Sequence, residues 1–125
     1  LNEFLKEASS HYGFNRNNVI AVGYSNGANI AGSLLFHYEN SLKAAILYHP
    51  MVPRRGITLP DLTTVPVFIG AGKNDPICPA QETEDLKELL SKAGSTVDVY
   101  WEYQGHQLTR AEVEASKKWY DENIR

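Results

Sequence analysis

Residues 23–27, Gly-Tyr-Ser-Asn-Gly, form the G-x-S-x-G pattern that most constrains this chain. They follow the apolar run 19–22, which is typical of a strand, and precede residues with helical spacing. A serine becomes a nucleophile only when an exposed turn holds it beside a base, and two small glycines let strand and helix pack closely enough to form that turn. By itself, this pattern is a purely structural strand-to-helix turn about half of the time. We interpret Ser25 as a candidate nucleophile.

Two further polar turns raise the odds of this interpretation. Residues 72–76, Gly-Lys-Asn-Asp-Pro, follow the apolar run 67–72, and Gly105-His106 follows the alternating run 96–103. The carboxyl ends of parallel strands meet at one edge of a sheet, so Asp75 and His106 could both approach Ser25 there. We expect His106 to be the general base, Asp75 to hold its imidazole, and the backbone N–H of Asn26 to be one oxyanion donor.

Each of these residues also has an ordinary interpretation. Asn-Asp-Pro is a common turn, and a loop histidine after glycine is unremarkable by itself. The combination favours a triad, because three turns would otherwise have to follow three apolar runs by accident in the order Ser, Asp, His.

Other residues near these turns carry weaker signals. Tyr24, Met51 and Val52 would border a substrate pocket, or they could equally be core. His49 ends an expected strand and could line the pocket without titrating usefully. Cys78 is the single cysteine, which we interpret as a buried, inert thiol near the end of a strand.

We expect neither a metal site nor a cofactor. No pair of histidines has metal-ligand spacing with a carboxylate, and one cysteine cannot form a cysteine-rich zinc site. His11 and His37 fall on expected helices, where we expect them to be solvated or to cap the helix.

The bulk properties limit the class of protein. With 125 residues, 42% hydrophobic residues and a net charge of −3, the chain is one soluble globular domain at most. Basic residues are dispersed, with adjacent pairs only at 54–55 and 117–118, so neither nucleic acid nor a lipid surface is a favoured partner. No apolar run approaches the roughly 20 residues of a membrane span, and no targeting segment is visible. We therefore expect a cytoplasmic protein without membrane insertion.

The hydrophobic pattern predicts alternating helices and strands. Helices are expected over 4–12, after Ser25, from Pro79 as first helical residue to a closing Gly94, and after a capping box at residues 109–112 with Leu108 and Val113 as a hydrophobic staple. Strands are expected over 19–22, 43–49, 67–72 and 96–103, the last with a wetter face or at an edge. This order predicts an α/β fold with a parallel, right-handed doubly wound sheet flanked by helices.

Three segments resemble a known group of enzymes. Residues 23–29, 72–79 and 105–109 are similar to the phospholipase/carboxylesterase group of α/β-hydrolases, which includes acyl-protein thioesterase-like and dienelactone hydrolase-like enzymes. The resemblance covers nearly the whole chain and implies an α/β-hydrolase fold and cofactor-free cleavage of a small-molecule carboxylic ester or thioester through an acyl-serine. It assigns nucleophile, acid and base to Ser25, Asp75 and His106. Dienelactone hydrolases proper are less similar, because their nucleophile is usually Cys.

The chain departs from this group at its start. Such enzymes place about four strands and a loop with a second oxyanion donor before the helix that follows the nucleophile, and residues 1–125 contain no such segment. We therefore expect the chain to be the C-terminal part of one catalytic domain, with a strand edge that would favour a homo-oligomer. Two alternatives stay open: peptidase or acyltransferase chemistry on the same triad, and a binding module with a vestigial triad.

Overall fold

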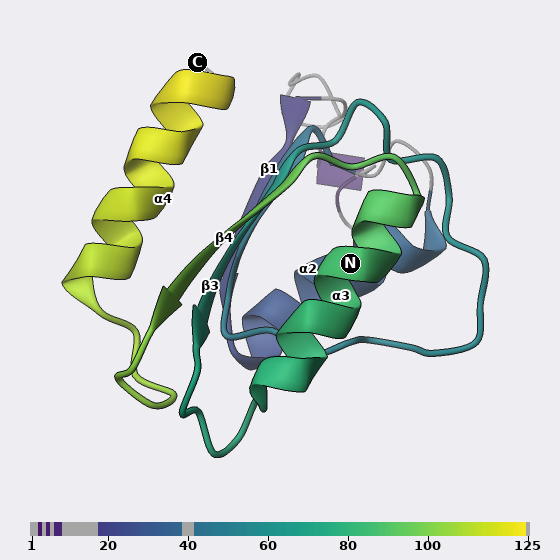
Figure 1. Ribbon diagram of the computed structural model, residues 1–125. Coiled ribbons are helices and arrows are strands. Elements are labelled where there is room, and N and C mark those ends of the chain that lie inside the picture. Colours follow the sequence, from purple (N-terminus) through teal and green to yellow (C-terminus); the bar gives the residue numbers. More distant parts are fainter. Residues whose placement is uncertain (1–2, 4, 6, 9–17, 39–41, 125) are drawn as a thin grey trace.

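The computed structural model describes residues 3, 5, 7–8, 18–38 and 42–124, and the fold is built from those residues (Figure 1). Residues 3, 5, 7 and 8 are helical, and the rest of the expected first helix, including His11, lies outside the described residues. The first strand, β1 (Ile20–Tyr24), leads into helix α2 (Asn26–His37). Strands β2 (Ala44–Tyr48) and β3 (Val67–Gly72) follow, then helix α3 (Ala80–Lys92), strand β4 (Val97–Glu102) and helix α4 (Arg110–Asn123).

The four strands form one parallel sheet in the order β1-β2-β3-β4. In register, Tyr24 pairs with Tyr48, Tyr48 with Gly70, and Gly70 with Tyr100, so the carboxyl ends of the strands are nearly level. β1 and β4 are the two edges of this sheet, as expected for the alternating run that became β4. The loops that follow these strands therefore meet at the carboxyl end of the sheet.

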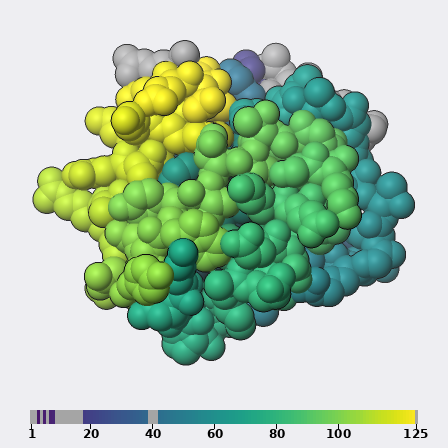
Figure 2. All heavy atoms as spheres, viewed as in Figure 1, coloured from purple at the N-terminus to yellow at the C-terminus, as the bar shows by residue number. Residues whose placement is uncertain are grey.

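Strand side chains alternate between two cores, because successive residues point to opposite faces. One core joins the sheet to α2 and α3 through buried residues such as Leu47, Ile69 and Leu86. The other joins it to α4, where Trp119 packs with Phe68. Figure 1 shows α4 on one side of the sheet and α2 and α3 on the other, and in Figure 2 the yellow atoms of α4 lie against the green atoms of β4. The expected α/β architecture is confirmed.

The helix ends mostly follow the sequence signals. Gly94 follows α3 with φ of 103°, a backbone conformation that favours glycine. Thr109 and Glu112 form the expected capping box at the start of α4. Pro79 is the N-cap of α3 and not its first helical residue, because its ψ of 148° is extended, so that prediction was wrong by one position.

The expected hydrophobic staple of α4 is only partly supported. Leu108 and Val113 occupy the required positions on either side of the cap, but they are 37% and 44% exposed and no described contact joins them. None of the described helices combines the length and the apolar character that a membrane crossing needs.

Candidate active site

Ser25 lies at the sharp turn between β1 and α2. Its φ of 55° and ψ of −112° are a backbone conformation that side-chain-bearing residues rarely adopt, and its N–H donates to Tyr48 O at 2.9 Å. Its side chain makes no capping hydrogen bond to α2. The turn therefore presents the hydroxyl to the neighbouring loops instead of to its own helix.

The two glycines of the G-x-S-x-G pattern are not equivalent. A Cβ at Gly23 would lie 2.4 Å from the Gly27 carbonyl carbon, so the close approach of β1 and α2 requires glycine there. A Cβ at Gly27 would meet no described atom within 4 Å. The close approach therefore joins the two glycines, but among the described residues only Gly23 of this pair is required to lack a side chain.

The structure brings Ser25, His106 and Asp75 together in one hydrogen-bonded chain. His106 Nε2 lies 2.9 Å from Ser25 Oγ, and His106 Nδ1 lies 2.7 Å from Asp75 Oδ2. Because an ionised carboxylate only accepts, Nδ1–H donates to Asp75 and leaves Nε2 as the acceptor for the serine hydroxyl. This arrangement can remove a proton from Ser25.

Asp75 is buried and saturated with donors. Its Oδ1 accepts the N–H groups of Ile77 and Cys78 at 2.8 and 2.9 Å, while its Oδ2 faces His106. Burial by itself would raise the pKa of Asp75, but the hydrogen bonds from Cys78 N–H, His106 and Ile77 N–H outweigh it and lower that pKa. Asp75 is thus an ionised, fixed acceptor.

The loop that carries His106 is held against the Asp75 loop. Gly105 N–H donates to Asn74 Oδ1 at 3.0 Å, and Gly105 itself has a φ of 62°. A Cβ at Gly72 would lie 2.2 Å from Gly105 O, so this contact also depends on glycine. The Tyr24 hydroxyl donates to His106 O, and the two rings lie 5.4 Å apart. Contacts from β1 and from the loop after β3 thus hold the segment that carries His106.

The other sequence-predicted residues lie nearby, and their roles stay predictions. Asn26 opens α2, so its N–H is among the helix's first donors, which have no acceptor within the helix. Met51 and Val52 follow β2 and are half-buried; Met51 N–H donates to Asn29 Oδ1 at 2.8 Å, and Val52 packs against the core.

His49 was not expected to take part in this network. The sequence places it at a strand end lining a pocket, whereas the structure buries it, with 2% exposed. His49 Nδ1 lies 3.0 Å from Asp75 Oδ2, and Nε2 lies 3.0 Å from Glu112 Oε1. Burial would lower the pKa of His49, but the hydrogen bond and charge of Glu112, followed by those of Asp75, outweigh it and raise that pKa.

His49, His106 and Asp75 together have the spacing of a metal-binding cluster. One ligand atom from each of His49, Asp75 and His106 lies within 4.8 Å of the others. Sequence spacing cannot reveal this cluster, because its members follow three different strands. Both Nδ1 atoms already lie at hydrogen-bond distance from Asp75 Oδ2, which explains their proximity without an ion.

Cys78 and His37 lie where the sequence predicts. Cys78 is buried, and its thiol donates to His49 O at 3.2 Å. Burial, followed by the charges of Asp75 and Glu82, raises the pKa of Cys78 to about 11, so the thiol stays protonated near neutral pH. His37 is exposed on α2, where its Nδ1 lies 2.8 Å from Ser33 O.

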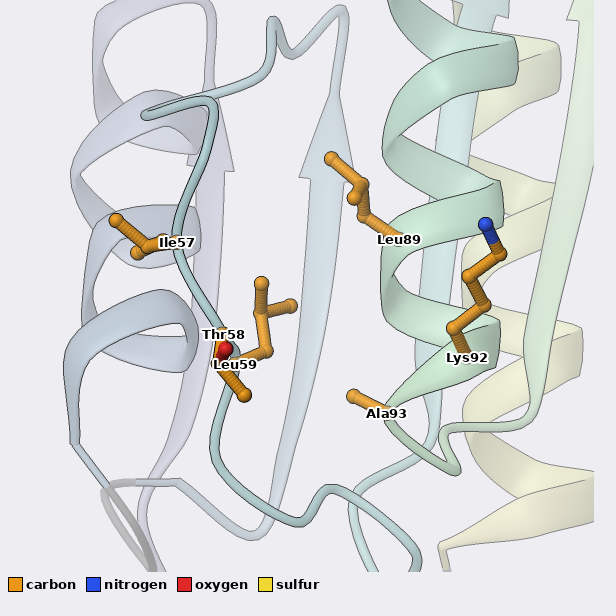
Figure 3. Close-up of a pocket in the computed structure, with 6 residues that line it drawn as sticks. All are labelled: Ile57, Thr58, Leu59, Leu89, Lys92 and Ala93. Carbon is orange, nitrogen blue, oxygen red and sulfur yellow. The ribbon is translucent and has the colours of Figure 1, made fainter.

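One described cavity lies away from these residues. It has a volume of about 230 Å³ and lies between the loop after β2 and the end of α3 (Figure 3). The segment after α3 lies at the amino end of the sheet, where Val67 N–H donates to Thr96 O, whereas Ser25 follows the carboxyl end of β1. The cavity is lined by Ile57, Thr58, Leu59, Leu89, Lys92 and Ala93.

Comparison with known proteins gives consistent relatives. The chain is 58% identical over 124 residues to MhqD of Bacillus subtilis (strain 168), covering 99% of this chain and 62% of MhqD. Its structure matches a carboxylesterase of Bacillus cereus with a TM-score of 0.97 and 61% identity, covering 98% of this chain and 58% of that one. It also matches YahD, solved with malic acid, with a TM-score of 0.92 and 31% identity, covering 98% of this chain and 59% of YahD.

The chain therefore spans less than two thirds of the length of these relatives. The likeness to the carboxylesterase confirms the α/β-hydrolase fold. The family model of the dienelactone hydrolase family matches residues 2–122. This group is one of those named by the sequence resemblance, although the chain has Ser25 where Cys is usual. From the extent of that match, the chain belongs to the dienelactone hydrolase family.

Proposed function

We propose that this chain carries the nucleophile, base and acid of a serine hydrolase that cleaves a carboxylic ester through an acyl-Ser25 intermediate. The observation that carries the proposal is the chain of hydrogen bonds from Ser25 Oγ to His106 at 2.9 Å and from His106 to Asp75 at 2.7 Å. The likeness to a Bacillus cereus carboxylesterase supports ester chemistry, and membership of a hydrolase family agrees with it.

In the first half-reaction, Ser25 Oγ attacks the ester carbonyl carbon while His106 Nε2 takes the hydroxyl proton. Asp75 keeps the imidazole in the required tautomer and stabilises the imidazolium. The Asn26 N–H is one donor to the tetrahedral oxyanion, and such a donor typically contributes about 10²–10³ in kcat. His106 then gives its proton to the leaving alcohol oxygen, which leaves the acyl group on Ser25.

In the second half-reaction, His106 removes a proton from water, which attacks the acyl carbon. Collapse of the second tetrahedral species returns the proton to Ser25 and releases the acid. We propose a small-molecule ester as substrate, and the likeness to a Bacillus cereus carboxylesterase supports this choice. Thioesters would react by the same steps.

A fluorophosphonate probe tests the proposal directly, because it phosphonylates an activated serine. We expect peptide mass spectrometry to find the label on Ser25, together with hydrolysis of short-chain aryl esters. Ser33→Ala is the matched control, since Ser33 lies on α2 outside the hydrogen-bonded chain, and it should be labelled like the parent. A parent chain that takes no label at Ser25 would instead favour a binding module with a vestigial triad.

A further inference from the structure

His49 shares an unusual backbone conformation with Ser25. Both have a φ of 55°, and they are the only residues other than glycine with positive φ in the described part of the chain. They follow the ends of the neighbouring strands β2 and β1. Such conformations persist only where the surrounding structure holds them, and they cluster at functional sites. This places His49 in the same structural category as the candidate nucleophile.

Both ring nitrogens of His49 face carboxylate oxygens. Nδ1 lies 3.0 Å from Asp75 Oδ2, and Nε2 lies 3.0 Å from Glu112 Oε1. An ionised carboxylate can only accept, and neutral imidazole can donate from only one nitrogen. If both carboxylates are ionised, satisfying both contacts therefore requires the doubly protonated ring. The ring is buried with 2% exposed, so water does not compete for these contacts.

The carboxylate of Glu112 stabilises the protonated form of His49. Its residue is fully buried, and Oε2 has no hydrogen-bond partner among the described residues. A Cβ at Gly70 would lie 2.5 Å from that oxygen, so β3 leaves space for the carboxylate. A buried carboxylate without a cation is costly, and protonated His49 is the group that faces it.

Among the described residues packed around His49, no Lys or Arg contacts the ring, and His106 is the one further group that can become a cation. The Tyr24 ring of β1 lies 5.9 Å from the His49 ring, and the His106 ring after β4 lies 5.3 Å from it. The Cys78 thiol donates to the backbone oxygen of His49.

We propose that His49 is a positioning residue: held protonated between Asp75 and Glu112, it fixes the Asp75 carboxylate that orients His106. Asp75 Oδ2 then accepts one hydrogen bond from each histidine, and the bond from protonated His49 is charge-assisted. The carboxylate cannot rotate away from His106 without breaking its bond to His49. The effect of His49 on kcat rests on the proposed ester hydrolysis, in which His106 acts as the base. The protonation of His49 does not depend on that proposed function.

The first test is NMR of the histidine ring nitrogens in the full chain as the pH is varied. We expect both nitrogens of His49 to show the imidazolium signature at pH 7.5. In Glu112→Gln, which keeps the size of the side chain, His49 should lose that proton at lower pH than in the parent. A neutral His49 ring at pH 7.5 in the parent overturns the proposal.

The second test is the kinetic effect of His49→Asn on ester hydrolysis. Asn tolerates the left-handed backbone better than most residues but cannot carry the charge. We expect kcat to fall about tenfold to a hundredfold, by analogy with the loss of hydrogen-bond partners that orient metal-ligating histidines, with KM within about twofold. Ser116→Ala is the matched control, because it removes a buried hydrogen bond between α4 and Tyr48 without touching the network. It should lower stability and leave kcat unchanged.

Equal kcat in His49→Asn and the parent overturns the positioning role. If His49→Asn does not fold, the NMR comparison of the parent with Glu112→Gln decides the proposal. Failure of the proposed function looks different: the parent itself would neither hydrolyse esters nor take a fluorophosphonate label at Ser25, whatever the state of the His49 ring.

Discussion

The acid side and the nucleophile side of the site contrast in their surroundings. Asp75 is 6% exposed and accepts four hydrogen bonds when both histidines donate to it. Ser25 instead follows β1, the edge of the described sheet, where Val22 is 62% exposed. Asp75 is buried among inner elements, whereas Ser25 is half-buried and follows an outer strand of the described sheet.

This difference matches what each group must do. A carboxylate that orients a base acts through fixed charge, which is stronger and better defined away from water. A nucleophile has to meet a substrate, and Ser25 is accordingly half-buried where Asp75 is buried. The acid side therefore depends on packing between β2, β3 and α4, and the nucleophile side depends on one backbone turn. The following substitutions separate these two dependencies.

The largest effect is expected from Ser25→Ala. Removing the hydroxyl leaves only binding and oxyanion contacts, so kcat for short-chain aryl esters should fall on the order of 10⁴-fold or more. Stability should change little, because the Ser25 side chain makes no capping bond to α2. Steady-state kinetics and urea unfolding measure both. Activity within tenfold of the parent would show that another group is the nucleophile.

Asp75→Asn should damage both function and folding. The amide favours the wrong His106 tautomer, so kcat should fall by about 10³–10⁴, as in other triads. Unlike Ser25→Ala, it should also lower the free energy of unfolding, because buried His49 loses a charged partner. An Asp75→Asn protein as stable as Ser25→Ala would contradict the contrast between the two sides.

Gly23→Ala and Gly27→Ala compare the two glycines of one motif. A Cβ at Gly23 would lie 2.4 Å from backbone, so we expect about 1–3 kcal/mol of destabilisation and a displaced Ser25 turn. At Gly27 a Cβ meets nothing within 4 Å, and alanine is the better helix former, so α2 should gain about 0.5–1 kcal/mol. Thermal unfolding and ester hydrolysis measure the pair; equal losses would contradict the geometry.

The smallest effect is a pH dependence of stability. The folded-state pKa of Asp75 is lowered, so its contribution is present above the unfolded value near 3.8 and is lost as the pH falls through the lower folded value. The difference in unfolding free energy between the parent and Asp75→Asn should thus be constant between pH 5 and 6 and shrink below about pH 3.8. Urea unfolding from pH 6 to pH 2.5 measures it. A stability difference between the parent and Asp75→Asn that grows as the pH falls would contradict the lowered pKa of Asp75.

Local signals predicted much of this molecule. The capping box at Thr109 and the closing Gly94 are set by residues within one helical turn, and both were predicted. The proximity of Ser25, Asp75 and His106 followed from the rule that parallel strands end at one edge. Their catalytic roles stay predictions.

Long-range contacts were not predictable in the same way. Glu112 was assigned from sequence to its helix cap alone, although its side chain also faces His49, 63 positions away. No periodicity or spacing connects these residues, because their contact depends on α4 lying across the face of β2 and β3. The open space at Gly27 likewise depends on where α2 points and not on the motif.

Glu112 Oε1 accepts from two sources at once: the Thr109 N–H at 3.2 Å and the His49 ring at 3.0 Å. One atom thus closes the first turn of α4 and holds the buried imidazole. Fraying of that turn and loosening of the Asp75 side should then be a single opening event, with one free energy in amide hydrogen exchange at Thr109 and Glu112. A helix end, normally the least protected part of a helix, would here be protected as well as the buried network behind it.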